Sequence, residues 1–180
     1  MMPAIYDDTL RSKESNEPAK LIAFNRTGRP VDILWINYAA KLVLYRLLGK
    51  DDQTEMDTFK THPWIFRDCY TGLLMHVNHK EVFWPEASTD KRPIQHVYIH
   101  YPVQSLKTIS SWAIITKARN LNEISQMEIP QTLRNDLGTL YRQFYNHHVT
   151  LAQRRMEQRR NLQRRQQQQQ QLQLQQHRNQ

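Results

Sequence analysis

Cysteines, glycines and long apolar runs are all scarce in this 180-residue chain. Cys69 is the only cysteine, so no internal disulfide can form, and this favours a reducing cytosol or nucleus. Because no run of about 18 apolar residues is present, we expect no insertion into a membrane. The first 20 residues contain acidic side chains and no apolar core, so we expect no secretory signal there.

The short motifs of common enzymes and metal sites are also missing. The chain has no Gly-rich phosphate loop, no G-x-S-x-G and no C-x-x-C. The histidine pairs His76/His79 and His96/His100 suggest a metal, but four residues along a strand separate two backbones by about 13 Å. We therefore predict a protein that has no catalysis of its own and uses no cofactor and no metal.

Positive charge is concentrated in the last 30 residues. Residues 151–180 contain seven arginines and one glutamate, a net charge of +6 out of +8 for the whole chain. The rest is close to neutral, which argues against a specific nucleic-acid surface in the folded part. The six-glutamine run predicts an Arg/Gln-rich tail over 151–180 that is partly helical and then disordered.

Short segments rich in β-branched and aromatic residues occupy residues 21–102, after an expected flexible arm over 1–20. They are separated by turn sequences such as "NRTGRP", "GKDDQ" and "STDKRP". This spacing predicts a small antiparallel β-sandwich. The expected strands include "VDILWIN", "KLVLYRLL", "MDTFKTH", "WIFRDC", "LLMHVNH" and "IQHVYIHY".

Residues 103–150 have a helical pattern, so the fold class is α+β, a sandwich followed by a small helical domain. Ser105 is placed to cap a first helix, "SLKTISSWAIITKAR", whose apolar residues fall all around it. A second helix carries one narrow apolar stripe of Leu133, Leu137, Leu140 and Phe144. The first helix has more apolar surface than the second can cover, so either the sheet or another protein covers the remainder.

The stretch "TFKTHPWIFRD" combines a hydroxyl, an imidazole and an indole. In a single strand Thr58, His62 and Trp64 would share one face, with Pro63 at an edge or bulge. Trp35 and Tyr45 come from other expected strands and can converge on the same pocket. The alternative to a binding pocket is a purely structural role, in which Trp35 packs in the core and Thr58 forms a local hydrogen bond with His62.

Several motifs occur in the order and spacing of one known family. They are "FNRTG", "WIN", the isolated Tyr45, "THPWIFRD", "GLL" and "NHKEVFWP". Over residues 20–150 the chain resembles the von Hippel–Lindau tumour suppressor family. The resemblance implies a cytoplasmic and nuclear recognition subunit of a ubiquitin ligase, assembled with elongin C, elongin B, cullin 2 and a RING-box protein. It also implies binding of 4-hydroxyproline in the α subunit of hypoxia-inducible factor.

The resemblance assigns residues to three contacts. The hydroxyproline pocket falls on Trp35, Tyr45, Thr58, His62 and Trp64. The elongin C contact falls on Leu106, Ile109, Ser110 and Ile114, and the cullin contact on Ile129, Pro130, Leu133 and Leu137. Four positions depart from the family. Thr58 stands where the family has serine, and Asp57 stands where it has histidine. Ser110 stands where cysteine is usual, and Ile109 where arginine is frequent.

The chemistry of the pocket residues agrees with this role. Aromatic walls suit a proline ring, and Thr58 with His62 offers a donor and an acceptor to its added hydroxyl. An unmodified proline leaves these groups unpaired, at about 1–3 kcal/mol each, and such pockets discriminate by about 10⁴. The competing hypotheses are an interaction or scaffold module that has lost the pocket, nucleic-acid binding through the tail and, last, a hydrolase.

Overall fold

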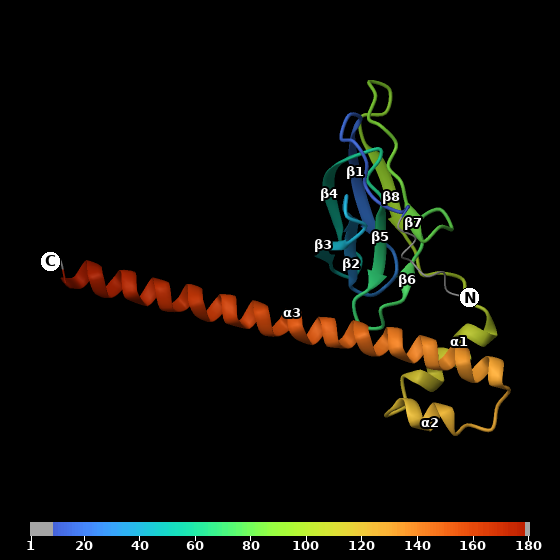
Figure 1. Cartoon of the computed structure of the whole chain (residues 1–180). Coiled ribbons are helices and arrows are strands. Elements are labelled where there is room, and N and C mark those ends of the chain that lie inside the picture. The colour runs from blue at the N-terminus through green and yellow to red at the C-terminus, as the bar shows by residue number, and fades with distance from the viewer. Residues whose placement is uncertain (1–8, 179–180) are drawn as a thin grey trace.

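The computed structural model describes residues 9–178, in which two β-sheets pack face to face and are followed by helices (Figure 1). The strands are β1 (Pro18–Asn25), β2 (Val31–Ile36), β3 (Leu42–Leu48), β4 (Gln53–Phe59), β5 (Trp64–Asp68), β6 (Leu74–Met75), β7 (Val82–Phe83) and β8 (Gln95–Ile99). The helices are α1 (Leu106–Ile115), α2 (Leu121–Ser125) and α3 (Gln131–Arg178). The predicted α+β class is confirmed.

One sheet has the order β4-β1-β8 and the other β3-β2-β5-β6, with β7 also pairing with β5. All of these pairs are antiparallel except β1 and β8, which are the first and last strands of the chain and run parallel. Burial alternates along β1 and β4, as expected for strands with one face on a core. The sandwich core lies between the sheets and includes Leu21, Ile33, Met56, Phe66 and Ile99.

The helical part has a much smaller core. Ser105 caps α1 as predicted, because its side chain accepts a hydrogen bond from the Thr108 backbone N–H. Ile115, Ile124 and Leu137 are buried together, and Leu140 and Phe144 pack against them. Trp112 contacts both this cluster and the sandwich core, so α1 is attached to both regions.

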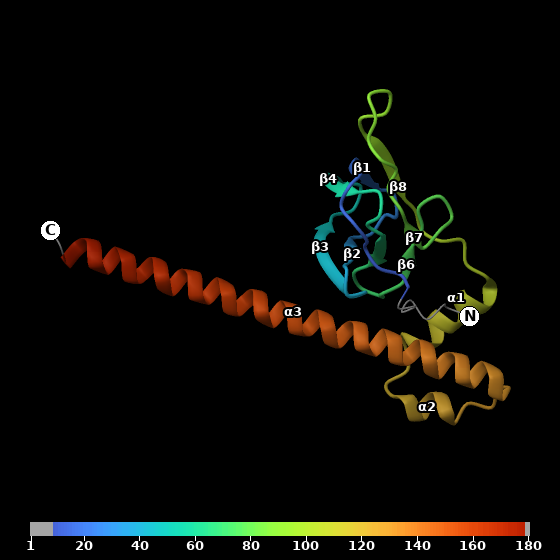
Figure 2. The ribbon, with the colours of Figure 1, turned by 45° about the horizontal axis from the view of Figure 1, so that its top comes forward.

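Helix α3 is a single helix of 48 residues that crosses the sandwich and projects beyond it (Figures 1 and 2). It therefore stays helical through the Arg/Gln-rich segment to Arg178, where the sequence led us to expect partial disorder. No glycine or proline follows Gly138, and arginine, glutamine and leucine are good helix formers. The last two positions of the tail, 179 and 180, and positions 1–8 of the expected arm lie outside the described residues.

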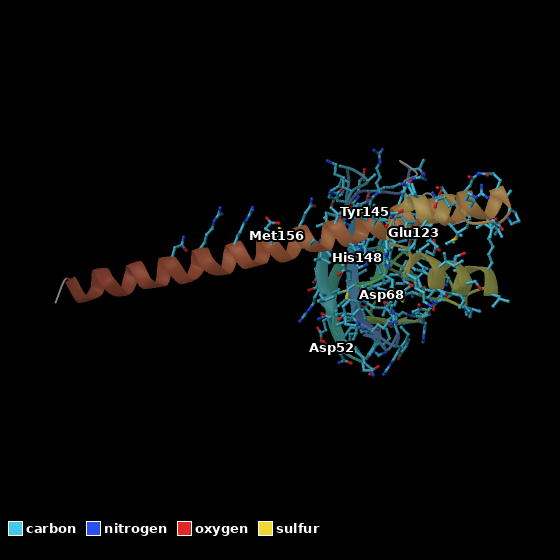
Figure 3. All side chains as sticks on the ribbon, turned by 90° about the horizontal axis from the view of Figure 1, so that it is seen from below. Asp52, Asp68, Glu123, Tyr145, His148 and Met156 are labelled. Atoms are coloured by element: carbon cyan, nitrogen blue, oxygen red, sulfur yellow. The ribbon has the colours of Figure 1, made fainter. Side chains whose placement is uncertain are left out.

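Buried polar contacts attach α3 to the sandwich. The ring of His147 is buried and its Nε2 donates to the Cys69 carbonyl at 3.0 Å. Gly72 allows this approach, because a Cβ there would lie 2.8 Å from His147 Cγ. Arg154 and Arg67 both pair with the buried carboxylate of Asp32, at 3.1 and 3.3 Å. Figure 3 shows Met156 near the point where the helix leaves the sandwich.

Candidate functional site: an aromatic and hydroxyl cluster at one end of the sandwich

The five predicted pocket residues lie in one cluster, although not for the reason that strand alternation suggests. Strand β4 ends at Phe59 and β5 begins at Trp64, so Thr58 and Trp64 belong to two strands and His62 to the turn between them. Pro63 stands just before β5, and its carbonyl accepts from the Ile36 N–H at 3.0 Å. The turn, rather than one shared strand face, brings the hydroxyl, imidazole and indole together.

Two tryptophans form the floor of this cluster. Trp35 on β2 and Trp64 on β5 are direct cross-strand partners. The ring of Trp35 lies 5.3 Å from that of His62. The indole N–H of Trp64 donates to the Thr58 hydroxyl at 3.1 Å. Because each indole contacts one of the two polar residues, Thr58 and His62 lie over neighbouring parts of one aromatic surface.

Tyr45 owes its position to an irregularity in β3. The pairing of β2 with β3 shifts between Ile33 and Leu34, whose partners are Arg46 and Leu44, so Tyr45 is the extra residue of a β-bulge. Its ring meets Trp64 edge-to-face, with centroids 5.3 Å apart. Tyr45 is 49% exposed and marks the solvent side of the cluster. No sequence pattern identified the bulge in advance.

The two polar residues of the cluster, Thr58 and His62, are buried. Thr58 is 6% exposed and His62 is 7% exposed. Burial lowers the pKa of His62, and a hydrogen bond with the Lys13 backbone partly opposes this shift. The imidazole is therefore neutral near pH 7, with one N–H donor and one acceptor nitrogen. A donor and an acceptor side by side suit a ligand group that both donates and accepts a hydrogen bond, such as an alcohol.

Residues 12–17 of the expected N-terminal arm lie against this cluster, which sequence reasoning did not predict. Ser12 accepts from the Trp35 indole N–H and donates to the Ile36 carbonyl, both at 2.6 Å. Ser15 contacts His62 Nε2 at 3.2 Å, and so does the hydroxyl of Tyr38. A cleft of about 690 Å³ runs beside the arm, lined in part by Ser12, Tyr38 and Thr61. The only local signal was the proximity of Tyr38 to Trp35 in "WINY".

The residues predicted to contact elongin C lie on α1 and differ in exposure. Leu106 and Ile109 are 78% and 52% exposed, and Ser110 is exposed beside them. Ile114 instead packs against the helical core. The sheet therefore does not cover the first part of α1.

The residues predicted to contact a cullin lie around the start of α3. Pro130 is exposed and immediately precedes the helix, where its carbonyl accepts from the Arg134 N–H. Leu133 is half-buried, and Ile129 packs against the helical core. Leu137 is buried in that core.

Within residues 9–178, no group of three or more histidine, cysteine or acidic side chains is arranged to hold a metal ion. In the same range no helix is long and apolar enough to cross a membrane.

Comparison with known proteins agrees with the fold and with the motifs. The family model described as the VHL beta domain matches residues 10–91, which include every residue of the aromatic and hydroxyl cluster. "Protein Vhl" of Drosophila melanogaster is 31% identical over 131 residues, covering 64% of this chain and 74% of the fly protein. This chain therefore belongs to the von Hippel–Lindau (VHL) family.

Proposed function

We propose that this protein is a substrate-recognition subunit of an elongin–cullin–RING ubiquitin ligase, and that it binds 4-hydroxyproline in the α subunit of hypoxia-inducible factor. Bound substrate is then ubiquitinated and degraded by the proteasome. The protein itself makes and breaks no covalent bond, and it acts in the cytoplasm and nucleus. The observation that carries the proposal is the cluster of Trp35, Tyr45, Thr58, His62 and Trp64 within a VHL beta domain.

The geometry of this cluster supports the proposed recognition step. The proline ring lies against the indoles and the edge of Tyr45, which supply apolar contact area at little cost in side-chain entropy. Its 4-hydroxyl reaches the Thr58 hydroxyl and the His62 ring, which are screened from water. An unmodified proline displaces water from Thr58 and His62 but forms no hydrogen bonds with them in its place. It therefore binds less tightly than hydroxyproline.

The test is a titration of the full chain with two peptides that differ only in the 4-hydroxyl of one proline. We expect the hydroxylated peptide to bind more tightly by several orders of magnitude, as polar pockets built around a hydroxyl allow. His62→Ala removes most of this difference, whereas Tyr98→Phe, on an exposed tyrosine of β8 outside the cluster, leaves it unchanged. Equal affinity of the wild-type protein for both peptides would reject hydroxyproline recognition.

The proposed ligase contacts use the helices. Leu106 and Ile109 offer the apolar surface on which elongin C docks, and elongin B joins through elongin C. Pro130 and Leu133 are the accessible part of the cullin 2 contact, with Ile129 and Leu137 supporting it from the helical core. A RING-box protein completes the assembly through the cullin.

A pair of charge substitutions tests these contacts separately. Leu106→Glu places a charge on the proposed elongin C surface and is expected to abolish co-purification of elongins B and C. Leu133→Glu is expected to retain the elongins and lose the cullin. If both variants still recover all partners, the proposed surfaces are wrong.

A second candidate function is an interaction or scaffold module that keeps the fold but does not read hydroxyproline. The burial of Thr58 and His62 favours it, as does the carboxylate of Asp57 on the exposed side of β4. Recovery of elongin C together with failure to bind either peptide would support this candidate. The same titration therefore separates the two functions.

A further inference from the structure

Three polar groups from separate segments meet at the outer edge of the proposed pocket. The Ser15 and Tyr38 hydroxyl oxygens are 2.7 Å apart, and each lies 3.2 Å from His62 Nε2. Ser15 belongs to the arm, and Tyr38 follows β2. The Tyr38 ring also stands edge-on to the rings of Trp35 and His62, at 5.6 and 5.5 Å. The hydroxyls of Ser15 and Tyr38, together with the Tyr38 ring, therefore restrict the position of the His62 imidazole.

The three distances are consistent with a chain of hydrogen bonds that ends at the ring. A phenol is a better donor than an alcohol, and the Ser15–Tyr38 distance is the shortest of the three. In this arrangement Ser15 donates to Tyr38 and Tyr38 donates to His62 Nε2, so that each bond polarises the next. Nε2 is then the acceptor nitrogen of the neutral ring, and the ring hydrogen sits on Nδ1.

We infer that Ser15 and Tyr38 are positioning residues that hold His62 as its Nδ1–H tautomer and so fix the direction in which a ligand hydroxyl is read. With Nε2 occupied by the Tyr38 hydroxyl, the ring offers no free acceptor to a ligand hydroxyl, so the ligand O–H donates to Thr58 Oγ1. Thr58 can accept this hydrogen because the Trp64 indole occupies only one of its two lone pairs. The identity of the ligand rests on the proposed function, whereas the tautomer does not.

The direct experiment measures the ring nitrogens of His62 by ¹⁵N NMR in the ligand-free full chain at a pH above 7.5. We expect the wild-type ring to be mainly the Nδ1–H tautomer. Tyr38→Phe removes only the donating hydroxyl, and we expect the Nε2–H tautomer to gain population because Nε2 can then donate to Ser15. Ser15→Ala is expected to act in the same direction but more weakly, and the control Tyr98→Phe to leave both nitrogen signals in place.

A wild-type ring that is mainly Nε2–H, or a ring unchanged in Tyr38→Phe, would overturn the inference. Both Ser15 and Tyr38 are exposed, so neither variant removes a core contact that folding requires. The NMR measurement needs no ligand, so it tests the tautomer even if the wild-type protein does not distinguish the two peptides.

The peptide pair provides the functional readout. With Tyr38→Phe we expect the hydroxylated peptide to lose about fivefold in affinity, the effect of one weakened hydrogen bond, and the unmodified peptide to lose none. An equal loss for both peptides would show a general effect on the binding surface and would contradict the positioning role. If wild type binds both peptides equally, the proposed function fails and the tautomer result stands alone.

Discussion

The sandwich and the helical part differ in how completely each covers its own apolar residues. Among the residues that the structure describes, fourteen buried residues form the main sandwich cluster, whereas three form the helical one. The sandwich can therefore hold the aromatic and hydroxyl cluster in place with its own core. The helical part depends on contacts with the sandwich through Trp112 and His147, and it still leaves Leu106 and Ile109 open. One region buries its own apolar residues, whereas the other leaves apolar side chains exposed on α1.

The largest expected effect comes from the small core of the helices. Ile115→Ala should lower the free energy of unfolding of the helical part by about 2–5 kcal/mol, because it leaves a cavity where few other apolar residues are buried. Leu106→Ala, nine positions earlier on the same helix, should change it by less than about 0.5 kcal/mol. Urea unfolding followed by circular dichroism measures both. Similar losses for the two variants would mean that α1 has no distinct buried and open ends.

A glycine pair tests the contact between the two regions. Gly72→Ala should cost about 2–3 kcal/mol, because φ is +77° and the new Cβ meets the His147 ring. Gly28→Ala is the matched control: its φ is +72° but nothing lies within 4 Å, so we expect about 1 kcal/mol. The difference between the two melting curves isolates the contact with α3. If the two variants are equally stable, this contact contributes nothing measurable.

The pH dependence of the same contact is expected to be a smaller effect. Burial, followed by the charge of Arg67, lowers the pKa of His147 below its ordinary value of 6.5. The unfolded chain therefore takes up a proton at this position before the folded protein does. The stability that this position contributes is complete above pH 6.5 and falls as the pH is lowered through the folded pKa.

Chemical denaturation at pH 8 and at pH 5 checks this sign. His147→Gln keeps a donor for the Cys69 carbonyl but does not titrate, so it should lose less stability between the two pH values than wild type. His62 contributes a dependence of the same sign in both proteins, because burial lowers its pKa as well. A larger loss in the variant than in wild type would contradict the assignment.

Local rules predicted much of the fold and part of the site. Ser105 caps α1 because a serine hydroxyl satisfies a free backbone N–H wherever a helix begins, and no distant residue is required. The stripe through Leu137, Leu140 and Phe144 meets Ile115 and Ile124 because helical periodicity alone decides which face is apolar. The family motifs located Trp35, Thr58, His62 and Trp64, and the structure brings these residues together.

The sequence on its own determined which residue types are available: two indoles, a hydroxyl and an imidazole near two turns, an Arg/Gln-rich end, and one helix with more apolar surface than its neighbour covers. Tertiary structure decided how they meet. The bulge that turns Tyr45 outward, the seating of Ser12 and Ser15 against Trp35 and His62, and the approach of His147 to Gly72 all join segments distant along the chain. Hydrogen bonds and close contacts of this kind depend on distances between segments, and these distances are fixed only when the whole chain packs.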